Sequence, residues 1–334
     1  MESQGKTTLN SMYSQWNLLP LESLGALRAR GRDVISFLQG QLSNDLALLA
    51  AERSLLAGYH NPQGRVLALL RLIEAAPGEV LAFLPRELVP SVVSRLSGFI
   101  LRSKVELADD SSAWRIEGLI GAAASEPPAA PAPGVAPLAP PFAAQLPAAA
   151  AGVARIGHGF AVRVGERPPR WLIVSPAAGP QGEPALARCA RAAPELWRRL
   201  GVENGEPQVY AATSGEFVAQ MLNLDVLGAI AFGKGCYTGQ EVIARAHYRG
   251  RVKRRLQRFR TREPLPLKPG DAGELADARA FRVVDAVTAA DGGCEFLAVA
   301  PLGPAELRAD EQPAPAGPLR LAAEQLPLPY ALPE

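Results

Sequence analysis

The sequence predicts an α+β protein with more than one domain, and three observations support this fold class. The chain has 334 residues, 48% of them apolar and 20% charged, which suffices for about two domains of roughly 150 residues with substantial cores. Apolar runs of strand length alternate with amphipathic stretches of helical spacing on both sides of an Ala/Pro-rich stretch. Two short apolar runs near the C-terminus, joined through Asp-Gly-Gly, indicate a small β domain.

The first 121 residues form the N-terminal α+β region. Helical spacing of apolar residues predicts helices over 33–48 and 86–100, and continuous apolar runs predict buried strands over 66–73 and 80–84. The segment 59–64, Tyr-His-Asn-Pro-Gln-Gly, carries the turn residues that precede the first of these strands.

Residues 122–150 separate this region from the rest of the chain. They contain 13 Ala and 8 Pro, a composition that removes backbone donors and offers little apolar area, so neither a regular helix nor a core strand is expected. We interpret them as a linker or a long surface excursion; the alternative is an irregular helix on a domain surface.

A second α+β region, 151–252, follows the linker, and the C-terminal β domain occupies 253–334. Strands are predicted over 160–164 and 171–174 and a helix over 185–200 in the second region. The C-terminal domain is expected to contain strands over 281–289 and 295–301.

The composition also limits the functional classes. No uninterrupted apolar run is long enough to span a membrane, and the N-terminal residues do not resemble a secretory signal. Three cysteines make no disulfide framework, so a cytoplasmic location is the simplest expectation. The cysteines and the three histidines lie far apart with no paired spacing, so we predict no metal site.

The net charge of +2 hides an uneven distribution. Residues 245–262, which we call the basic run, contain nine basic and no acidic residues, leaving 26 basic against 33 acidic residues elsewhere. Together with Tyr248 and Phe259, these cations suit a surface for RNA or another polyanion. The alternative is an amphipathic strand, because Val252 and Leu256 alternate with the charges.

The most informative segment is 232–250, FGKGCYTGQEVIARAHYRG. Thr238 and Glu241 have capping-box spacing, which predicts a helix starting at Thr238 with Cys236 just ahead of its N-terminus. A helix N-terminus and nearby Lys234 would favour the thiolate of Cys236. The alternative is an inert buried thiol. Residues 228–235 also match a phosphate-binding loop, but Gly235 stands where a hydroxyl must reach magnesium, so nucleotide hydrolysis is not expected.

A second candidate site lies in 197–207, WRRLGVENGEP. The carboxylate of Glu203 suits the amino-pyrimidine edge of a pterin, and Trp197 offers a flat face for stacking. The alternatives are a solvated Glu203 and a Trp197 that fills the core.

The segment KGCYTGQE, 234–241, resembles the signature of the YgfZ family of folate-binding proteins, relatives of the glycine-cleavage T-protein. The resemblance extends in order through FLQGQLSNDL (37–46), LRSKVEL (101–107), residues 213–256 and LPLPY (326–330). It implies a multi-domain T-protein-like fold around a central hole that holds tetrahydrofolate, with a small β-barrel-like C-terminal domain. It also implies a cytoplasmic role in maintaining iron–sulfur enzymes, including those that modify tRNA.

The resemblance assigns roles to individual positions. Glu203 falls where T-proteins place the carboxylate that grips the pterin, and Trp197 falls where a tryptophan packs on folate. Cys236 is the candidate catalytic thiolate. The full set of predicted cofactor-binding residues is Trp197, Glu203, Lys234, Gly235, Tyr237, Thr238, Gly239, Gln240, Glu241 and Arg245.

One departure from the T-protein pattern separates two functions. T-proteins carry adjacent aspartates that serve aminomethyl transfer, whereas this chain has Ala68 and Leu69 there. We therefore predict a folate-binding accessory protein with iron–sulfur proteins as partners. Two alternatives stay open: a folate-dependent one-carbon transferase with another acceptor, and an RNA-binding module that uses the basic run.

Overall fold

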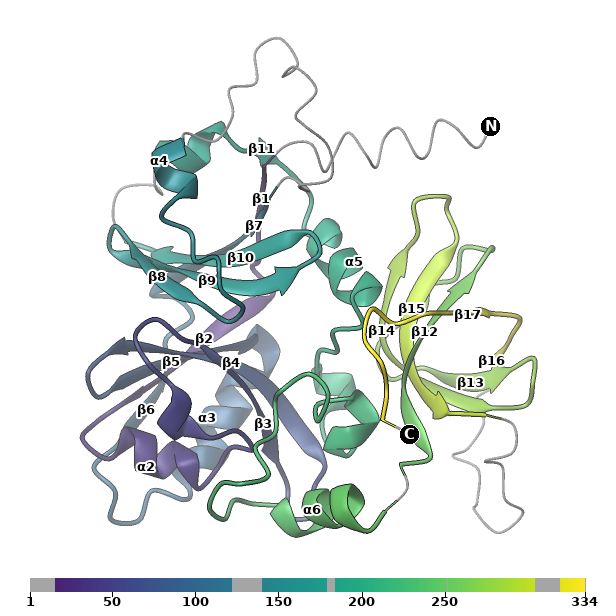
Figure 1. Cartoon of the computed structure of the whole chain (residues 1–334), viewed down its shortest axis with the longest axis horizontal. Coiled ribbons are helices and arrows are strands. Elements are labelled where there is room, and N and C mark those ends of the chain that lie inside the picture. The colour runs from purple at the N-terminus through teal and green to yellow at the C-terminus, as the bar shows by residue number, and fades with distance from the viewer. Residues whose placement is uncertain (1–15, 122–139, 179–183, 251, 304–318, 334) are drawn as a thin grey trace. The chain divides into compact units, whose positions relative to one another are not determined.

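The computed structural model describes residues 16–121, 140–178, 184–250, 252–303 and 319–333 (Figure 1). The chain divides into two compact units, each built from three separate segments. The first unit comprises Met1–Phe37, Leu46–Leu55 and Arg71–Trp197, and the second comprises Leu38–Asp45, Leu56–Leu70 and Arg198–Glu334.

The first unit contains a six-stranded sheet with the order β11-β1-β7-β10-β9-β8. Successive side chains of its long antiparallel strands point to opposite faces, and one face buries Leu119, Ala161, Trp171 and Ile173 in a common core. The strands are β1 (Asn17–Pro20), β7 (Trp114–Ile120), β8 (Val153–Ile156), β9 (Gly159–Glu166), β10 (Pro169–Pro176) and β11 (Ala190–Arg191).

The end of the Ala/Pro-rich stretch contributes to this core, which the sequence did not predict. Residues 122–139 lie outside the described residues, but α4 (Pro140–Ala143) is a short helix. Phe142 and Leu146 are buried in the same cluster as Trp171, whose indole nitrogen donates to the carbonyl oxygen of Pro147 at 2.9 Å. The expectation of no helix is therefore wrong for 140–143, because two large apolar side chains stabilise the turn by burial.

A five-stranded sheet has the order β3-β4-β5-β2-β6. Its strands are β2 (Leu24–Arg30), β3 (Leu55–His60), β4 (Val66–Ala76), β5 (Glu79–Pro85) and β6 (Glu106–Asp109). The helical elements nearby in sequence are α2 (Val34–Gln39), η1 (Leu46–Leu48), η2 (Arg86–Leu88) and α3 (Val89–Ser97). In α3, Pro90 occupies the first turn and Val89, Val92 and Leu96 form the buried stripe.

Two predicted helices are shorter than expected. The helix predicted over 33–48 ends at Gln39, where Gly40 follows, and only η1 resumes helical geometry. The helix predicted over 185–200 is split into η3 (Pro184–Arg188), the strand β11 and α5 (Glu195–Glu203). Parallel pairing of β11 with β1 and the proline at 194 both oppose a continuous helix.

The second unit contains the C-terminal sheet, which curves into an incomplete barrel (Figure 1). Its order is β16-β13-β14-β15-β12-β17, and its core contains Phe259, Phe281 and Phe296. The strands are β12 (Arg254–Thr261), β13 (Ala272–Leu275), β14 (Ala280–Thr288), β15 (Cys294–Pro301), β16 (Leu319–Leu321) and β17 (Glu324–Leu326). The predicted α+β class with a C-terminal β domain is confirmed.

The remaining helical elements of the second unit are short. They are η4 (Ala211–Thr213), η5 (Ala219–Leu222) and α6 (Gln240–Tyr248). No helix among the described residues is both long and apolar enough to cross a membrane.

Candidate functional site

The signature loop, residues 234–241, belongs to the second unit and is anchored by its lysine. The Nζ of Lys234 donates to the carbonyl oxygens of Gln39 at 2.7 Å, Leu42 at 2.5 Å and Asn44 at 2.8 Å. Burial lowers the pKa of Lys234 to about 8, and the charge of Asp45 partly opposes this shift. An ammonium group has three donors, and here all three are used within the protein, so Lys234 positions the loop.

Tyr237 and His60 lie beneath the loop. The ring of Tyr237 is buried, has Lys234 Nζ 5.0 Å from its centroid, and lies 6.1 Å from the ring of His60. Burial raises the pKa of Tyr237 to about 12 and lowers the pKa of His60 to about 3. Neither ring nitrogen of His60 makes a hydrogen bond of good geometry among the described residues, although the nearby backbone of Gly58 opposes part of the pKa shift. These two rings form a neutral, buried floor for the loop.

The predicted capping box does not form. Helix α6 begins at Gln240 with Gly239 as its N-cap residue, and no side chain caps it. Gly239 has φ +82°, and a Cβ there would lie 2.5 Å from the carbonyl oxygen of Asn61. The close approach of the β3–β4 turn therefore requires a glycine at position 239.

Cys236 and Gly235 lie on the outer side of the loop. Cys236 is a free, exposed cysteine, so the burial that the alternative interpretation assumed is wrong. Gly235 does not have a positive φ, and a Cβ there would meet no atom within 4 Å. Nothing in the described protein requires glycine at 235, and the space beside the thiol is open.

Of the other predicted residues of the signature, Gln240 is bound within the loop, whereas Glu241 and Arg245 face outward. The side-chain oxygen of Gln240 accepts from the backbone N–H of Tyr237 at 3.1 Å, which closes the turn before α6. Glu241 and Arg245 are exposed on α6, and Thr238 is half-buried.

Glu203 is the last residue of α5 and is held through its backbone. Arg258 Nη1 donates to the carbonyl oxygen of Glu203 at 3.3 Å, while its guanidinium pairs with Glu295 at 2.6 Å. The Glu203 side chain is 29% exposed and lies 4.0 Å from Arg199 Nε. A partly exposed carboxylate on a fixed helix end is a suitable acceptor for the donor edge of a pterin.

Trp197 ends the first unit and has a packing role. A Cβ at Gly118 would lie 2.5 Å from Trp197 Cε3, and the guanidinium carbon of Arg170 lies 5.4 Å from the ring centroid. The side chain is only half-buried, so Trp197 packs on the sheet that carries Gly118 and Arg170 without being enclosed in the core. Stacking on a ligand stays a prediction.

The basic run is not a uniform cationic surface. Arg255 makes a bidentate ion pair with Asp225 at 3.0 and 2.9 Å, and the two side chains are only 4% and 9% exposed. Phe259 is fully buried, so it is unavailable to a polyanion. Arg258 and Arg260 pair with acidic residues of the same sheet. Ion pairs with Asp225, Glu295 and Asp291 thus compensate most of the charge that the sequence suggested for this strand.

Tyr248, which the sequence already associated with the basic run, lies at the other end of that run in an aromatic cluster that the sequence did not predict. His247 stacks on Phe232 with ring centroids 3.7 Å apart, and Tyr248 contacts both rings edge-on. Tyr248 is 68% exposed, and Arg245 and Arg249 are exposed on the same helix. The available signal was the adjacent pair His247 and Tyr248, which stands between Arg245 and Arg249.

The strand that replaces the aspartate pair of T-proteins is entirely apolar at that point. Ala68 and Leu69 are buried in β4. Across the described residues, no three His, Cys, Asp or Glu side chains are arranged to hold a metal ion.

Comparisons with known proteins agree with the signature. The chain is 32% identical over 294 residues to the tRNA-modifying protein YgfZ of Edwardsiella ictaluri, covering 84% of this chain and 83% of that protein. It is 34% identical over 251 residues to the protein of the same name from Serratia proteamaculans, covering 74% and 71%. No protein-family model matches the chain.

Among solved structures, the chain resembles the glycine cleavage system aminomethyltransferase T from Bartonella henselae. The TM-score is 0.68 at 15% identity, with 88% of this chain and 81% of the other covered. This likeness confirms the expected T-protein-like fold. From its sequence relatives, this chain belongs to the YgfZ family.

Proposed function

We propose that this chain is a tetrahydrofolate-binding accessory protein that supports iron–sulfur enzymes and, through them, tRNA modification. The observation that carries the proposal is the exposed Cys236 on a loop held from within by Lys234. The sequence relatives are named tRNA-modifying proteins, which supports the tRNA part of the proposal.

The residues present fit a bound folate. Glu203 would accept hydrogen bonds from the pterin, and the open space at Gly235 would let a ligand approach the Cys236 thiol closely. The folate would supply a carrier for a one-carbon unit. Aminomethyl transfer of the T-protein kind is not part of the proposal, because β4 presents Ala68 and Leu69 where that chemistry needs carboxylates.

Complementation tests the role of the thiol. A bacterial strain lacking its YgfZ protein would be complemented with the wild type, Cys236→Ala or Cys189→Ala, and thiomethylated tRNA nucleosides would be quantified. Cys189 is a buried free cysteine and controls for loss of any thiol. We expect rescue by the wild type and Cys189→Ala only. Equal rescue by Cys236→Ala at matched protein level would reduce Cys236 to a structural residue.

Titration tests folate binding separately. Tetrahydrofolate should change the intrinsic tryptophan fluorescence, and Glu203→Gln should weaken binding by roughly tenfold because a charge-assisted hydrogen bond is lost. Trp197→Ala should remove the fluorescence change. Absence of any change in the wild type, together with no heat of binding by calorimetry, would contradict the folate part.

A second candidate function is direct RNA contact through the α6 cluster of Phe232, His247 and Tyr248. Exposed aromatic rings beside arginines suit unpaired bases and phosphates. This candidate predicts salt-dependent tRNA binding that weakens in Tyr248→Ala and Arg249→Glu. Arg255 is unsuitable for this test because its charge is buried against Asp225. Binding unaffected by both variants would exclude the candidate.

A further inference from the structure

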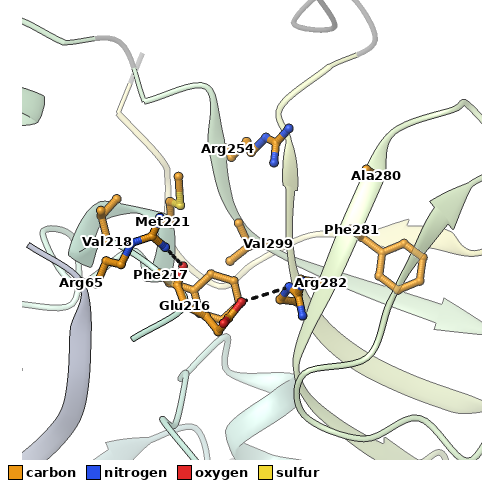
Figure 2. A pocket seen from close by; sticks show the side chains of 10 residues that line it. All are labelled: Arg65, Glu216, Phe217, Val218, Met221, Arg254, Ala280, Phe281, Arg282 and Val299. Carbon is orange, nitrogen blue, oxygen red and sulfur yellow. Dashed lines mark hydrogen bonds and ion pairs between the residues drawn. The ribbon is translucent and has the colours of Figure 1, made fainter. Parts of the chain in front are cut away.

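The second unit contains a hollow of about 240 Å³ that no predicted site residue lines, which we call the arginine pocket (Figure 2). It lies between the segment around Glu216 and one face of the C-terminal sheet. Its lining residues are Arg65, Glu216, Phe217, Val218, Met221, Arg254, Ala280, Phe281, Arg282 and Val299. Three guanidinium groups therefore share the pocket with one carboxylate and several apolar side chains.

The carboxylate does not neutralise this charge. Arg282 Nε lies 3.4 Å from Glu216 Oε2, and its Nη1 donates to the carbonyl oxygen of Gly270 at 3.0 Å. Arg65 Nη1 donates to the backbone carbonyl oxygen of Glu216 at 2.5 Å. Because a carbonyl carries no net charge, this hydrogen bond leaves the positive charge of Arg65 uncompensated. Apart from the backbone pairing of Arg254 with Pro301, the Arg254 side chain makes no hydrogen bond or ion pair with any described residue. Apolar walls strengthen the field of the uncompensated cations, which favours an anion in the hollow.

Strand register connects this pocket to Glu203. On β15, Leu297 pairs with Arg258 on one side and Asp285 on the other, while Val299 pairs with Arg282 and Pro301 with Arg254. Side chains two or four residues apart share a face, and the bulge between Val283 and Asp285 keeps Arg282 and Asp285 on that face too.

Residues paired with Leu297 hold both halves of α5, at Arg198 and at Glu203. Arg258 donates to the carbonyl of Glu203, and Asp285 pairs with Arg198 at 2.5 Å. Val299 and Pro301, which pair with the pocket arginines, lie two and four residues beyond Leu297 on β15. The distance from Leu297 and its pairing partners to the pocket is therefore about 7–14 Å at the usual rise of a strand. The pteroyl part of a folate spans such a distance before its glutamate carboxylates begin.

We propose that the arginine pocket binds the carboxylates of the oligo-γ-glutamate tail of a folate whose pterin lies at Glu203. The proposal rests on the proposed folate function. Arg254 and Arg282 would pair with carboxylates, and the methylene groups between them would lie on Met221 and Val299. This alternation of carboxylates and short apolar linkers matches the pocket better than an RNA backbone, whose bulky sugars exceed so small a hollow.

The first experiment compares tetrahydrofolate carrying one glutamate with tetrahydrofolate carrying five, by calorimetry on the full chain. The wild type should bind the longer form about tenfold more tightly or better, because charge-assisted hydrogen bonds are added. The double variant Arg254→Gln/Arg282→Gln should lose most of this difference, because the pentaglutamate form loses more affinity than the monoglutamate form. Arg262→Gln, an exposed arginine that does not line the pocket, is the matched control.

The proposal is overturned if the double variant keeps the tail-dependent gain, or if it loses affinity for both forms equally. Thermal melting of each variant checks that the fold persists. An unchanged double variant with the same melting temperature therefore counts directly against the pocket.

A second experiment separates this proposal from the folate function. Penta-γ-glutamate without a pteroyl group would be titrated into the same proteins, with inorganic phosphate and an oligoribonucleotide as competitors. Peptide binding that is lost in the double variant supports the pocket even where no folate binds. If the peptide does not bind, or only the oligoribonucleotide depends on Arg254 and Arg282, the tail assignment is wrong.

Discussion

The signature loop and the basic run are close in sequence. In both, one residue is bound within the protein while a near neighbour is left available to a ligand. In the loop, Lys234 is fully used by three backbone carbonyls, while Cys236 is exposed. In the run, Arg255 is buried against Asp225, while Arg254 faces the pocket without a partner among the described residues.

The two regions reach this division by different means. Alternation along β12 places Arg254 and Arg255 on opposite faces of one sheet. In the loop, the turn ending at Gly239 directs the side chains instead. A sequence motif or a run of charges therefore locates the candidate region. The hydrogen bonds and ion pairs in the structure then decide which of its residues are available to a ligand.

The largest expected change in stability tests the difference between Arg255 and Arg254 in the basic run. Asp225→Ala leaves the buried Arg255 guanidinium without its carboxylate, so the free energy of unfolding should fall by about 3–5 kcal/mol. Arg254→Gln should change it by less than about 0.5 kcal/mol. Urea denaturation of both variants measures the two changes in unfolding free energy. Similar losses in the two variants would contradict the assignment of Arg255 to a structural role and of Arg254 to the pocket.

The equivalent comparison in the loop is Lys234→Met against Cys236→Ala. Methionine keeps most of the aliphatic stem but leaves the carbonyls of Gln39, Leu42 and Asn44 without their donor. We expect a loss of about 2–3 kcal/mol in unfolding free energy. Cys236→Ala should stay within about 0.5 kcal/mol of the wild type and still fail in complementation. A Cys236→Ala protein as unstable as Lys234→Met would contradict this division.

His60 supplies a pH-dependent test of the floor beneath the loop. Its pKa is lowered by burial to about 3 in the folded protein, against about 6.5 when unfolded, so only the unfolded chain gains this proton between these values. Its contribution to stability is present above pH 6.5 and is lost as pH falls toward 3. Between pH 7 and 5 the loss should be about 2 kcal/mol.

The control for this test is His60→Phe, which removes the titrating group but not the buried ring. The difference between wild type and variant isolates His60 from the carboxylates that also titrate on acidification. Parallel stability curves for the two proteins between pH 7 and 5 would show that His60 is not the cause.

The sequence was sufficient for the fold class, the family and the signature, because these depend on local periodicity and on an uninterrupted motif. It was insufficient where distant segments decide the outcome. Gly239 ends the turn because Asn61 approaches it, and the charge of Arg255 is compensated because Asp225 pairs with it. The arginine pocket combines Arg65, Arg254 and Arg282 from three separate segments, so no sequence window contains it.

The smallest expected effects distinguish the two glycines of the signature. Gly239→Ala should cost about 1–2 kcal/mol in unfolding free energy, because φ is +82° and the new Cβ would lie 2.5 Å from the Asn61 carbonyl oxygen. Gly235→Ala meets open space and should change stability by less than about 0.5 kcal/mol. If the space beside Cys236 admits a ligand, Gly235→Ala should nevertheless weaken tetrahydrofolate binding. A stable Gly235→Ala protein with wild-type affinity would place the ligand away from the outer side of the loop.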